Sequence, residues 1–204
     1  MRTLKIWAFI MGLVSVIIIV TSCVLVNKNE GAETQTETTA ETIVVTKASE
    51  AIKSKIKFFE GFSGTATEDH GAYAYGYGHR DNNIQAGDTI TREDADALFE
   101  QDIVRFEEAV IRFADERGLS FTQNEFDALV SFLYNLGEHY LEVIEERSIR
   151  DESYRLVNYL VSGIYTEEEM TSEWTSYCHA GGEVVQGLLT RRAYEVNLFL
   201  RGEY

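Results

Sequence analysis

Residues 58 to 79 read FFEGFSGTATEDHGAYAYGYGH, and this stretch decides the fold. Its first acid, Glu60, follows an apolar run, and two further acids, Glu68 and Asp69, come eight and nine residues later. Glycines and tyrosines then alternate up to His79, a pattern typical of a small antiparallel sheet. Two carboxyl groups on either side of a short hairpin can cleave a glycosidic bond, one as acid and the other at the attacking water or sugar.

A helix is predicted immediately before this stretch. Ile52, Ile56 and Phe59 have the spacing of one helix face, so a helix is expected to run through them as far as Glu60 and Gly61. Glu60 and Gly61 follow at the point where the apolar pattern stops, and a glycine is a common helix end. The pattern therefore places Glu60 at the carboxyl end of a helix and at the entrance to the sheet.

Helices are also predicted for most of the chain after the sheet. Residues 91–94 and 122–125 resemble capping boxes, and apolar residues at helical spacing follow each of them. Gly137 is expected to end the second of these helices. Further helices are predicted over residues 151–162, 167–178 and 189–201.

The composition excludes several classes of function. The chain has 204 residues and a formal net charge of −16, so its surface repels nucleic acid, and we expect no nucleic-acid partner. Its two cysteines, Cys23 and Cys178, give no disulfide framework, since Cys23 lies in an apolar N-terminal segment. The four histidines are scattered and no cysteine–histidine group has zinc spacing, so no metal site is expected.

Residues 1–26 are predicted to be an export signal or membrane anchor. Arg2 and Lys5 precede an apolar run that is long enough to span a bilayer. The segment VTSC ends at Cys23 and resembles a bacterial lipobox, in which the cysteine is acylated; the alternative is a single transmembrane helix. Either anchor places the rest of the chain outside the cytoplasm and tethers it to the cell membrane.

A linker and one domain are predicted after the anchor. Residues 27–47 are rich in Thr and Glu and hold too few apolar groups to fold, so they are expected to form a disordered linker. Residues 48–204 form the predicted globular domain.

Five segments, in order, resemble the phage-type lysozymes, the glycoside hydrolase family 24 endolysins. EGFSGTATED resembles the family's acid motif, E-G-x(4)-A-Y-x-D, and GYGH resembles the end of its glycine-rich hairpin. TITREDADALFEQDI and FTQNEFDALVSFLYNLG resemble two central helix signatures. WTSYCHAGGEVVQGLLTRRAYEVNLF resembles the C-terminal block, W…GG…GL-x-x-RR-x-x-E. Each segment alone is a weak signal, and the five in register together are strong evidence of the resemblance.

The resemblance implies an α+β fold, mainly α, with a small antiparallel β-sheet lobe, a larger helical lobe and a cleft between them. It implies a lysozyme (N-acetylmuramidase) that hydrolyses the β-1,4 bond between N-acetylmuramic acid and N-acetylglucosamine, with inversion at the sugar. The expected partner is the glycan strand of peptidoglycan. No metal or organic cofactor is implied, and we expect a monomer.

The resemblance also assigns the catalytic residues. Glu60 matches the family's general acid, and Asp69 matches the second carboxylate by its spacing of nine residues. Counting back from Gly71 favours Glu68 instead, because the loop is one residue shorter than the family pattern. Arg192 matches the arginine that packs near the general acid. The second acid is therefore expected at Asp69, with Glu68 as the alternative.

One position departs from the family pattern. The family usually reads T-I-G-Y-G-H at the hairpin, where the threonine helps to hold the attacking water, and this chain has Ala74 in that place. Alanine has no hydroxyl with which to orient a water molecule. Four nearby residues are candidates to supply the missing hydroxyl, namely Tyr73, Tyr75, Thr65 and Thr67.

The same departure motivates two rival functions, a lysozyme-like module that binds peptidoglycan without cutting it and a lytic transglycosylase, which needs an acid but no positioned water. An envelope adaptor that uses the acidic helical surface is a third. His79 matches a structural position that ties the hairpin to the helical lobe. Trp174 is expected in the core, and one of the hairpin tyrosines is expected at the cleft.

Overall fold

The computed structural model describes residues 45–69 and 71–204 of the chain. The predicted anchor with Cys23, and the predicted linker as far as residue 44, lie outside the described residues. Among the residues that are described, no helix is long and apolar enough to span a bilayer.

Helix α1 (Glu50–Glu60) forms as the apolar spacing predicts. The Ser49 side chain caps its first turn by accepting a hydrogen bond from the Ile52 N–H, and Ile52 and Ile56 are fully buried. The helix ends at Gly61, whose φ of 69° is a conformation that side-chain-bearing residues rarely adopt. Glu60 is therefore held at a helix end, with its backbone fixed on both sides.

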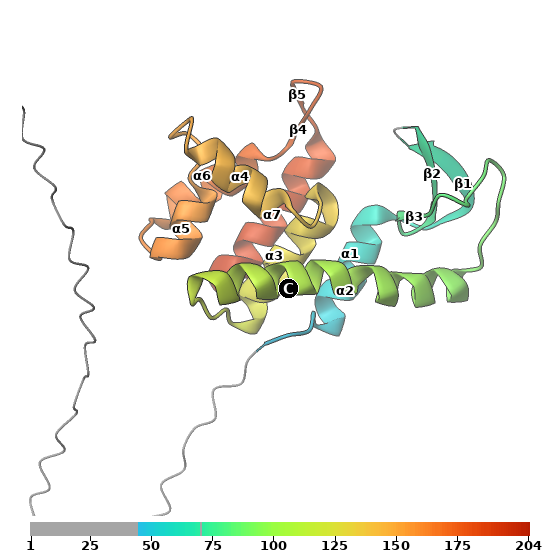
Figure 1. Cartoon of the computed structure of the whole chain (residues 1–204), viewed down its shortest axis with the longest axis horizontal. Coiled ribbons are helices and arrows are strands. Elements are labelled where there is room, and N and C mark those ends of the chain that lie inside the picture. The colour runs from blue at the N-terminus through green and yellow to red at the C-terminus, as the bar shows by residue number, and fades with distance from the viewer. Residues whose placement is uncertain (1–44, 70) are drawn as a thin grey trace, which may run out of the picture. The chain divides into compact units, whose positions relative to one another are not determined.

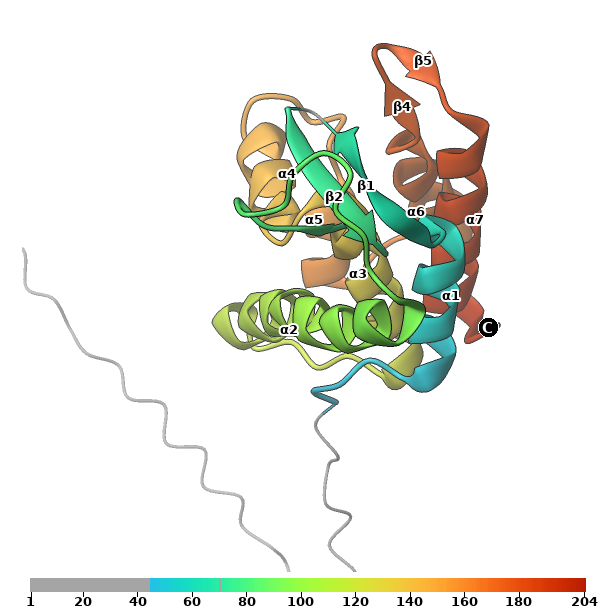
Figure 2. The ribbon, with the colours of Figure 1, turned by 90° about the vertical axis from the view of Figure 1, so that its right-hand side faces the viewer.

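The small predicted sheet is present and antiparallel. Its strands are β1 (Ser63–Asp69), β2 (Ala72–Gly76) and β3 (His79–Arg80), in that spatial order. Gly76 and Gly78 have φ values of 64° and 93°, so the chain reverses tightly between β2 and β3. Figure 1 shows the sheet beside the end of α1 and apart from most of the helices, and Figure 2 shows β1 continuing from that end of α1.

Six further helices and a second, short hairpin follow. Thr91 caps α2, and Thr122 and Glu125 form the predicted capping box at the start of α3, which ends at Gly137 as expected. Figure 1 shows α2 running from the sheet to the helical lobe. The elements are α2 (Arg92–Arg117), α3 (Gln123–Leu136), α4 (Tyr140–Ser148), α5 (Leu156–Ser162), α6 (Glu167–Ser176), β4 (His179–Ala180), β5 (Glu183–Val184) and α7 (Gln186–Arg201).

Three of these elements, α4, β4 and β5, were not predicted. Helix α4 lies before the helix that was expected over residues 151–162. Only Leu141 and Ile144 of α4 are buried, so its sequence shows a weak helical spacing of apolar residues. The β4–β5 hairpin has two residues in each strand, too few to show an alternating pattern. The predicted helix over residues 167–178 correspondingly ends earlier, at Ser176.

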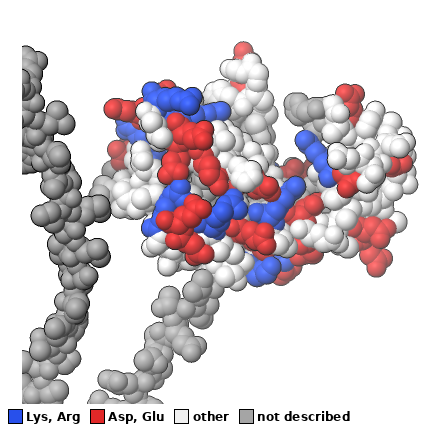
Figure 3. Space-filling model, viewed as in Figure 1, with Lys and Arg blue, Asp and Glu red and all other residues white. Residues whose placement is uncertain are grey.

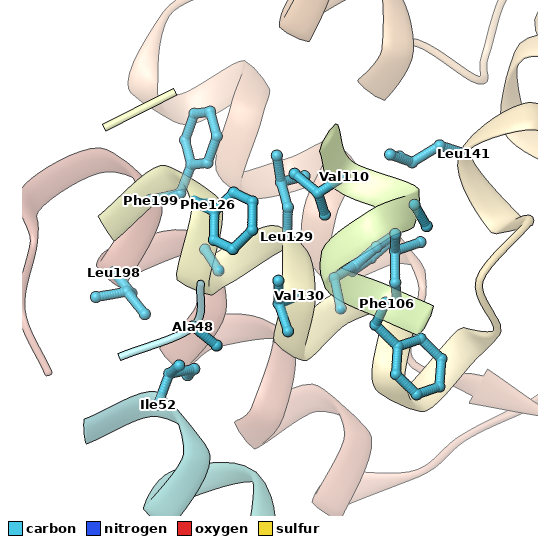
Figure 4. Close-up of a cluster of buried hydrophobic side chains, with 14 of the residues drawn as sticks. Ala48, Ile52, Phe106, Val110, Phe126, Leu129, Val130, Leu141, Leu198 and Phe199 are labelled. Atoms are coloured by element: carbon cyan, nitrogen blue, oxygen red, sulfur yellow. The ribbon is translucent and has the colours of Figure 1, made fainter. Parts of the chain in front are cut away.

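The core is centred on α3, which packs against both α2 and α7. Phe126, Leu129 and Val130 of α3 are fully or almost fully buried and are drawn with their neighbours in Figure 4. Trp174 is fully buried as expected, with its ring 5.2 Å from the ring of Phe132. The α+β fold, mainly α, is thus confirmed, with one helical core beside a small sheet.

Two buried carboxylates fix the start of the domain. Glu107 accepts hydrogen bonds from the Ala48 N–H at 2.8 Å and from Lys47 Nζ at 3.0 Å. Asp127 accepts one from the Ser49 N–H at 3.0 Å. A buried carboxylate needs such donors to offset the loss of hydration. The backbone is therefore held in place at the predicted junction between linker and domain.

Candidate active site

Glu60 contacts a buried arginine at the end of α1. Arg191 Nη1 donates to Glu60 Oε1 at 2.6 Å, and the side chains are 4% and 22% exposed, respectively. The other carboxyl oxygen, Oε2, lies toward the hairpin, since a Cβ added at Gly78 would stand 4.0 Å from it. One oxygen of Glu60 is thus held by the helical lobe, and the other faces the sheet.

Arg191 is itself held by two further acceptors. Its Nε donates to Glu195 Oε1 at 3.0 Å, and its Nη2 donates to the carbonyl oxygen of Ser131 at 2.9 Å. The Ser131 hydroxyl also donates to Glu195 Oε1, at 2.7 Å. With three acceptors around one planar guanidinium, Arg191 has a single well-defined position from which to hold Glu60.

The prediction that Arg192 is the arginine near the general acid is therefore wrong. Arg192 is fully buried and points elsewhere: its Nη2 donates to Asn135 Oδ1 at 3.0 Å, and its Nε lies 2.9 Å from Glu195 Oε2. Successive residues on a helix point about 100° apart, so only one of two adjacent arginines can face α1. Burial lowers the pKa of the Arg192 guanidinium, and the Glu195 carboxylate opposes that effect.

A cleft of about 680 Å³ opens beside Glu60. Residues of the sheet, of α2 and of the segment from the end of α3 into α4 line it. Its polar lining comes from Glu60, Arg80, Arg105, Tyr134, Asn135, Glu138, His139 and Tyr140. Side chains that can donate and accept hydrogen bonds thus line the cleft beside Glu60.

Tyr134 connects the two lobes at this cleft. Its hydroxyl donates to the backbone carbonyl of Tyr77 at 3.0 Å. Burial raises the pKa of the Tyr134 phenol, and the nearby carboxylates of Glu60 and Asp102 raise it further, so the group stays a neutral donor. Tyr77 itself is buried in the core. A tyrosine of α3 therefore lines the cleft, and the hairpin tyrosine beside it is structural.

His79 ties the hairpin to the helical lobe, as expected. Its Nδ1 lies 2.8 Å from Asp102 Oδ2 on α2, and its ring stacks on Tyr75 with the ring centres 5.9 Å apart. This contact joins β3 to α2 and so holds the hairpin against the helical lobe.

The two candidates for the second acid lie at the end of β1. Glu68 is exposed and pairs with Tyr73 across the hairpin. The backbone of Asp69 pairs with Ala72, and the Asp69 side chain lies outside the described part of the structure. Asp69 and Glu68 occupy adjacent positions in one strand, so they belong to opposite faces of the sheet.

Part of this site had a usable signal in the sequence. Glu195 stands four residues after Arg191 and three after Arg192, the spacings at which helix side chains meet, so its role between the two arginines was predictable. Tyr134 and Asn135 carry no such signal, because only the packing of α3 brings them to the cleft. Within the described ranges, no group of three or more His, Cys, Asp and Glu side chains is arranged to hold a metal ion.

Comparisons with known proteins show which family the chain resembles over most of its length. The phage lysozyme family model matches residues 57–195. Endolysins of Bacillus phages B103 and PZA are 33% and 35% identical over 153 and 152 residues, 72% of this chain and 52% of each relative. The chain thus spans about half the length of the curated relatives that it matches.

Two solved structures are similar over almost their whole length. The muramidase domain of SpmX from Asticaccaulis excentricus is 31% identical with a TM-score of 0.59, over 76% of this chain and 97% of that one. An endolysin from Escherichia coli O157:H7 phage FAHEc1 is 28% identical with a TM-score of 0.60, over 78% and 96%.

Proposed function

Because the chain belongs to the phage lysozyme family, we propose that it is a peptidoglycan hydrolase that cleaves the β-1,4 bond between N-acetylmuramic acid and N-acetylglucosamine. The observation that carries the proposal is the position of Glu60, at the end of α1, beside a cleft of about 680 Å³ and held by Arg191 at 2.6 Å. The relatives are named as endolysins and as a muramidase domain, which supports the same substrate class.

Glu60 acts as the general acid in this proposal. Its Oε1 accepts from Arg191, so the proton to be donated resides on Oε2, the oxygen on the side of Gly78. A glycosidic oxygen in the cleft takes that proton as the bond to the sugar breaks. Arg191 also donates hydrogen bonds to Glu195 and to the Ser131 carbonyl oxygen, so Glu60 shares the positive charge of Arg191 with these acceptors.

Asp69 is the second acid in this proposal, in preference to Glu68. Ala74 pairs with Arg80 across β2 and β3 and with Thr67 across β2 and β1. Paired residues share one face of a sheet, and Arg80 lines the cleft. Position 69 belongs to the same face of β1 as position 67, and position 68 belongs to the other face. This alternation favours Asp69 as the base that takes the proton of the attacking water.

We expect the protein to act outside the cytoplasm, tethered through its N-terminal segment by acylated Cys23 or by a transmembrane helix. We expect it to act as a monomer, because one chain supplies both proposed acids.

The test is release of soluble muropeptides from purified cell wall by the full chain, compared with Glu60→Gln, Asp69→Asn and Glu68→Gln. We expect Glu60→Gln and Asp69→Asn to lose most activity and Glu68→Gln to keep it. Background release by all four proteins, with retained binding to the wall, would instead identify a binding module. Loss in Glu68→Gln with activity in Asp69→Asn would reverse the assignment of the second acid.

A further inference from the structure

Two adjacent arginines of α7 hold two different residues of the cleft. Arg191 Nη1 donates to Glu60 Oε1 at 2.6 Å, and Arg192 Nη2 donates to Asn135 Oδ1 at 3.0 Å. Glu195 Oε1 accepts from both arginines, at 3.0 Å and 3.2 Å. Glu60 and Asn135 both line the cleft. One buried cluster therefore positions the proposed general acid and also a side-chain amide that takes no part in the proposed chemistry.

The contact with Arg192 fixes the orientation of the Asn135 amide. A guanidinium donates hydrogen bonds and accepts none, so it pairs with the amide oxygen and not with the amide nitrogen. Arg192 is fully buried and its Nε lies 2.9 Å from Glu195 Oε2, which holds the guanidinium in place. Within the part of the chain that the structure describes, Asn135 Nδ2 makes no hydrogen bond. With Oδ1 turned toward the buried arginine, Nδ2 is the amide atom that is left to a ligand in the cleft.

Asn135 lies one helical turn from a residue that anchors Arg191. The Ser131 carbonyl oxygen accepts from Arg191 Nη2 at 2.9 Å. Ser131 and Asn135 are four residues apart in α3, so they lie on the same face of the helix, about 6 Å apart along its axis. A glycan chain that occupies the cleft beside Glu60 therefore also passes the Asn135 amide.

A fixed amide donor suits one group of the proposed substrate. Each sugar of the glycan strand carries an N-acetyl group, and the carbonyl oxygen of that group is an acceptor. A hydroxyl both donates and accepts, and it rotates to suit its partner, so it does not require a donor of fixed orientation. A site that hydrogen-bonds one particular group of a substrate strongly rejects an analogue without that group, because its own polar atom is then left unpaired.

Other polar side chains of the cleft are less suited to this role. Arg105 lies 3.7 Å from Glu138, and the two side chains are 55% and 37% exposed, while His139 is 70% exposed. Exposed charged side chains such as these are held weakly in one geometry. The Tyr134 hydroxyl already donates to a backbone carbonyl oxygen of the hairpin at 3.0 Å. Asn135, by contrast, combines a fixed side chain with amide hydrogens that a ligand can use.

We propose that Asn135 determines specificity for N-acetylated glycan, by donating from Nδ2 to the carbonyl oxygen of an N-acetyl group. Arg192 is the positioning residue that holds the amide in the required orientation. The proposal rests on the proposed function and names the group of the substrate that the cleft recognises. Asn135 breaks no bond and transfers no proton, so its contribution is to the binding of the glycan.

The test measures, by isothermal titration calorimetry, the binding of two uncharged β-1,4-linked oligomers of equal length, one of N-acetylglucosamine and one of glucose. The full chain carries Glu60→Gln, so that neither oligomer is cut. This parent should prefer the N-acetylglucosamine oligomer, and adding Asn135→Asp should reduce the preference roughly 5- to 150-fold. A carboxylate at this position can still pair with Arg192, but it has no hydrogen to donate.

The matched control is Asn158→Asp, which makes the same change at an exposed position of α5 that does not line the cleft, and it should keep the preference. With Glu60 intact, Asn135→Asp should raise KM on purified cell wall and leave turnover nearly unchanged. Thermal unfolding shows whether each variant is folded, and Asn135→Ala, which removes the amide altogether, replaces Asn135→Asp if that variant is not.

Three outcomes would overturn the role of Asn135. They are an unchanged preference in Asn135→Asp, equal binding of the two oligomers by the parent, and a fall in turnover at unchanged KM. The proposed function fails on a different result, background release of muropeptides from cell wall by the wild-type chain. The binding measurement needs no hydrolysis, so it decides the role of Asn135 in either case.

Discussion

The most informative stability prediction concerns Glu195, which is fully buried between two arginines. Its Oε1 accepts from Ser131 at 2.7 Å, from Arg191 at 3.0 Å and from Arg192 at 3.2 Å. Its Oε2 accepts from Trp174 Nε1 at 3.3 Å. The change Glu195→Gln keeps the volume of the side chain but removes the negative charge, and it replaces one acceptor with a donor.

The cost follows from leaving buried positive charge without its partner. Removing one member of a buried ion pair costs about 3–5 kcal/mol, because the remaining charge cannot regain its hydration. For a domain of this size, each kcal/mol lowers the melting temperature by about 2–4 °C. We therefore expect Glu195→Gln to lower it by roughly 6–20 °C.

The matched control is Glu167→Gln. Glu167 pairs with Arg201 at 2.9 Å on the surface, where the two side chains are 65% and 46% exposed. Exposed pairs contribute about 0–1 kcal/mol, so this variant should unfold close to wild type. Urea unfolding followed by circular dichroism gives both free energies of unfolding. A loss in Glu195→Gln no larger than that in Glu167→Gln would refute the argument that Glu195 compensates the buried arginines.

Figure 3 shows acidic side chains spread over one face of the protein, and with a net charge of −16 we expect activity on anionic wall to rise from low to moderate salt; a steady fall would contradict this. Trp174→Ala should cost about 3–5 kcal/mol in urea unfolding, because the buried ring leaves a cavity beside Phe132, and a loss below about 1 kcal/mol would place it outside the core. Burial, with the hydrogen bond to Asp127, raises the pKa of Tyr204 to about 12. The neutral Tyr204 phenol therefore contributes fully to the free energy of unfolding below pH 10, and this contribution is lost as the pH rises toward 12. The difference in free energy of unfolding between wild type and Tyr204→Phe should shrink over that range.

The sequence identified the features that depend on local pattern. Glu60 stands where an apolar helix period stops, and Gly61 supplies the backbone conformation that ends the helix. The box of Thr122 and Glu125 marked the start of α3 because a capping box depends on only four residues. Such features need no knowledge of the rest of the fold.

The features that depend on packing were not accessible. Arg191 and Arg192 are adjacent, and the choice between them depends on how α7 is rotated against α1 and α3, which no local pattern specifies. Tyr134 follows an apolar run in α3, so its role at the cleft becomes visible only when the sheet is placed beside it. The pairing of Thr67 with Ala74 likewise depends on strand register, which an irregularity in β1 shifts.

The central claim is that this site hydrolyses the glycan by directing water at the sugar, and the origin of the new oxygen tests it most directly. Purified cell wall is digested by the full chain in water enriched in heavy oxygen, and the new muramic acid ends are examined by mass spectrometry. The account predicts reducing ends that each carry one solvent oxygen, and none from Glu60→Gln. Anhydro-muramic ends without solvent oxygen would show that no water attacks the sugar, and would contradict it.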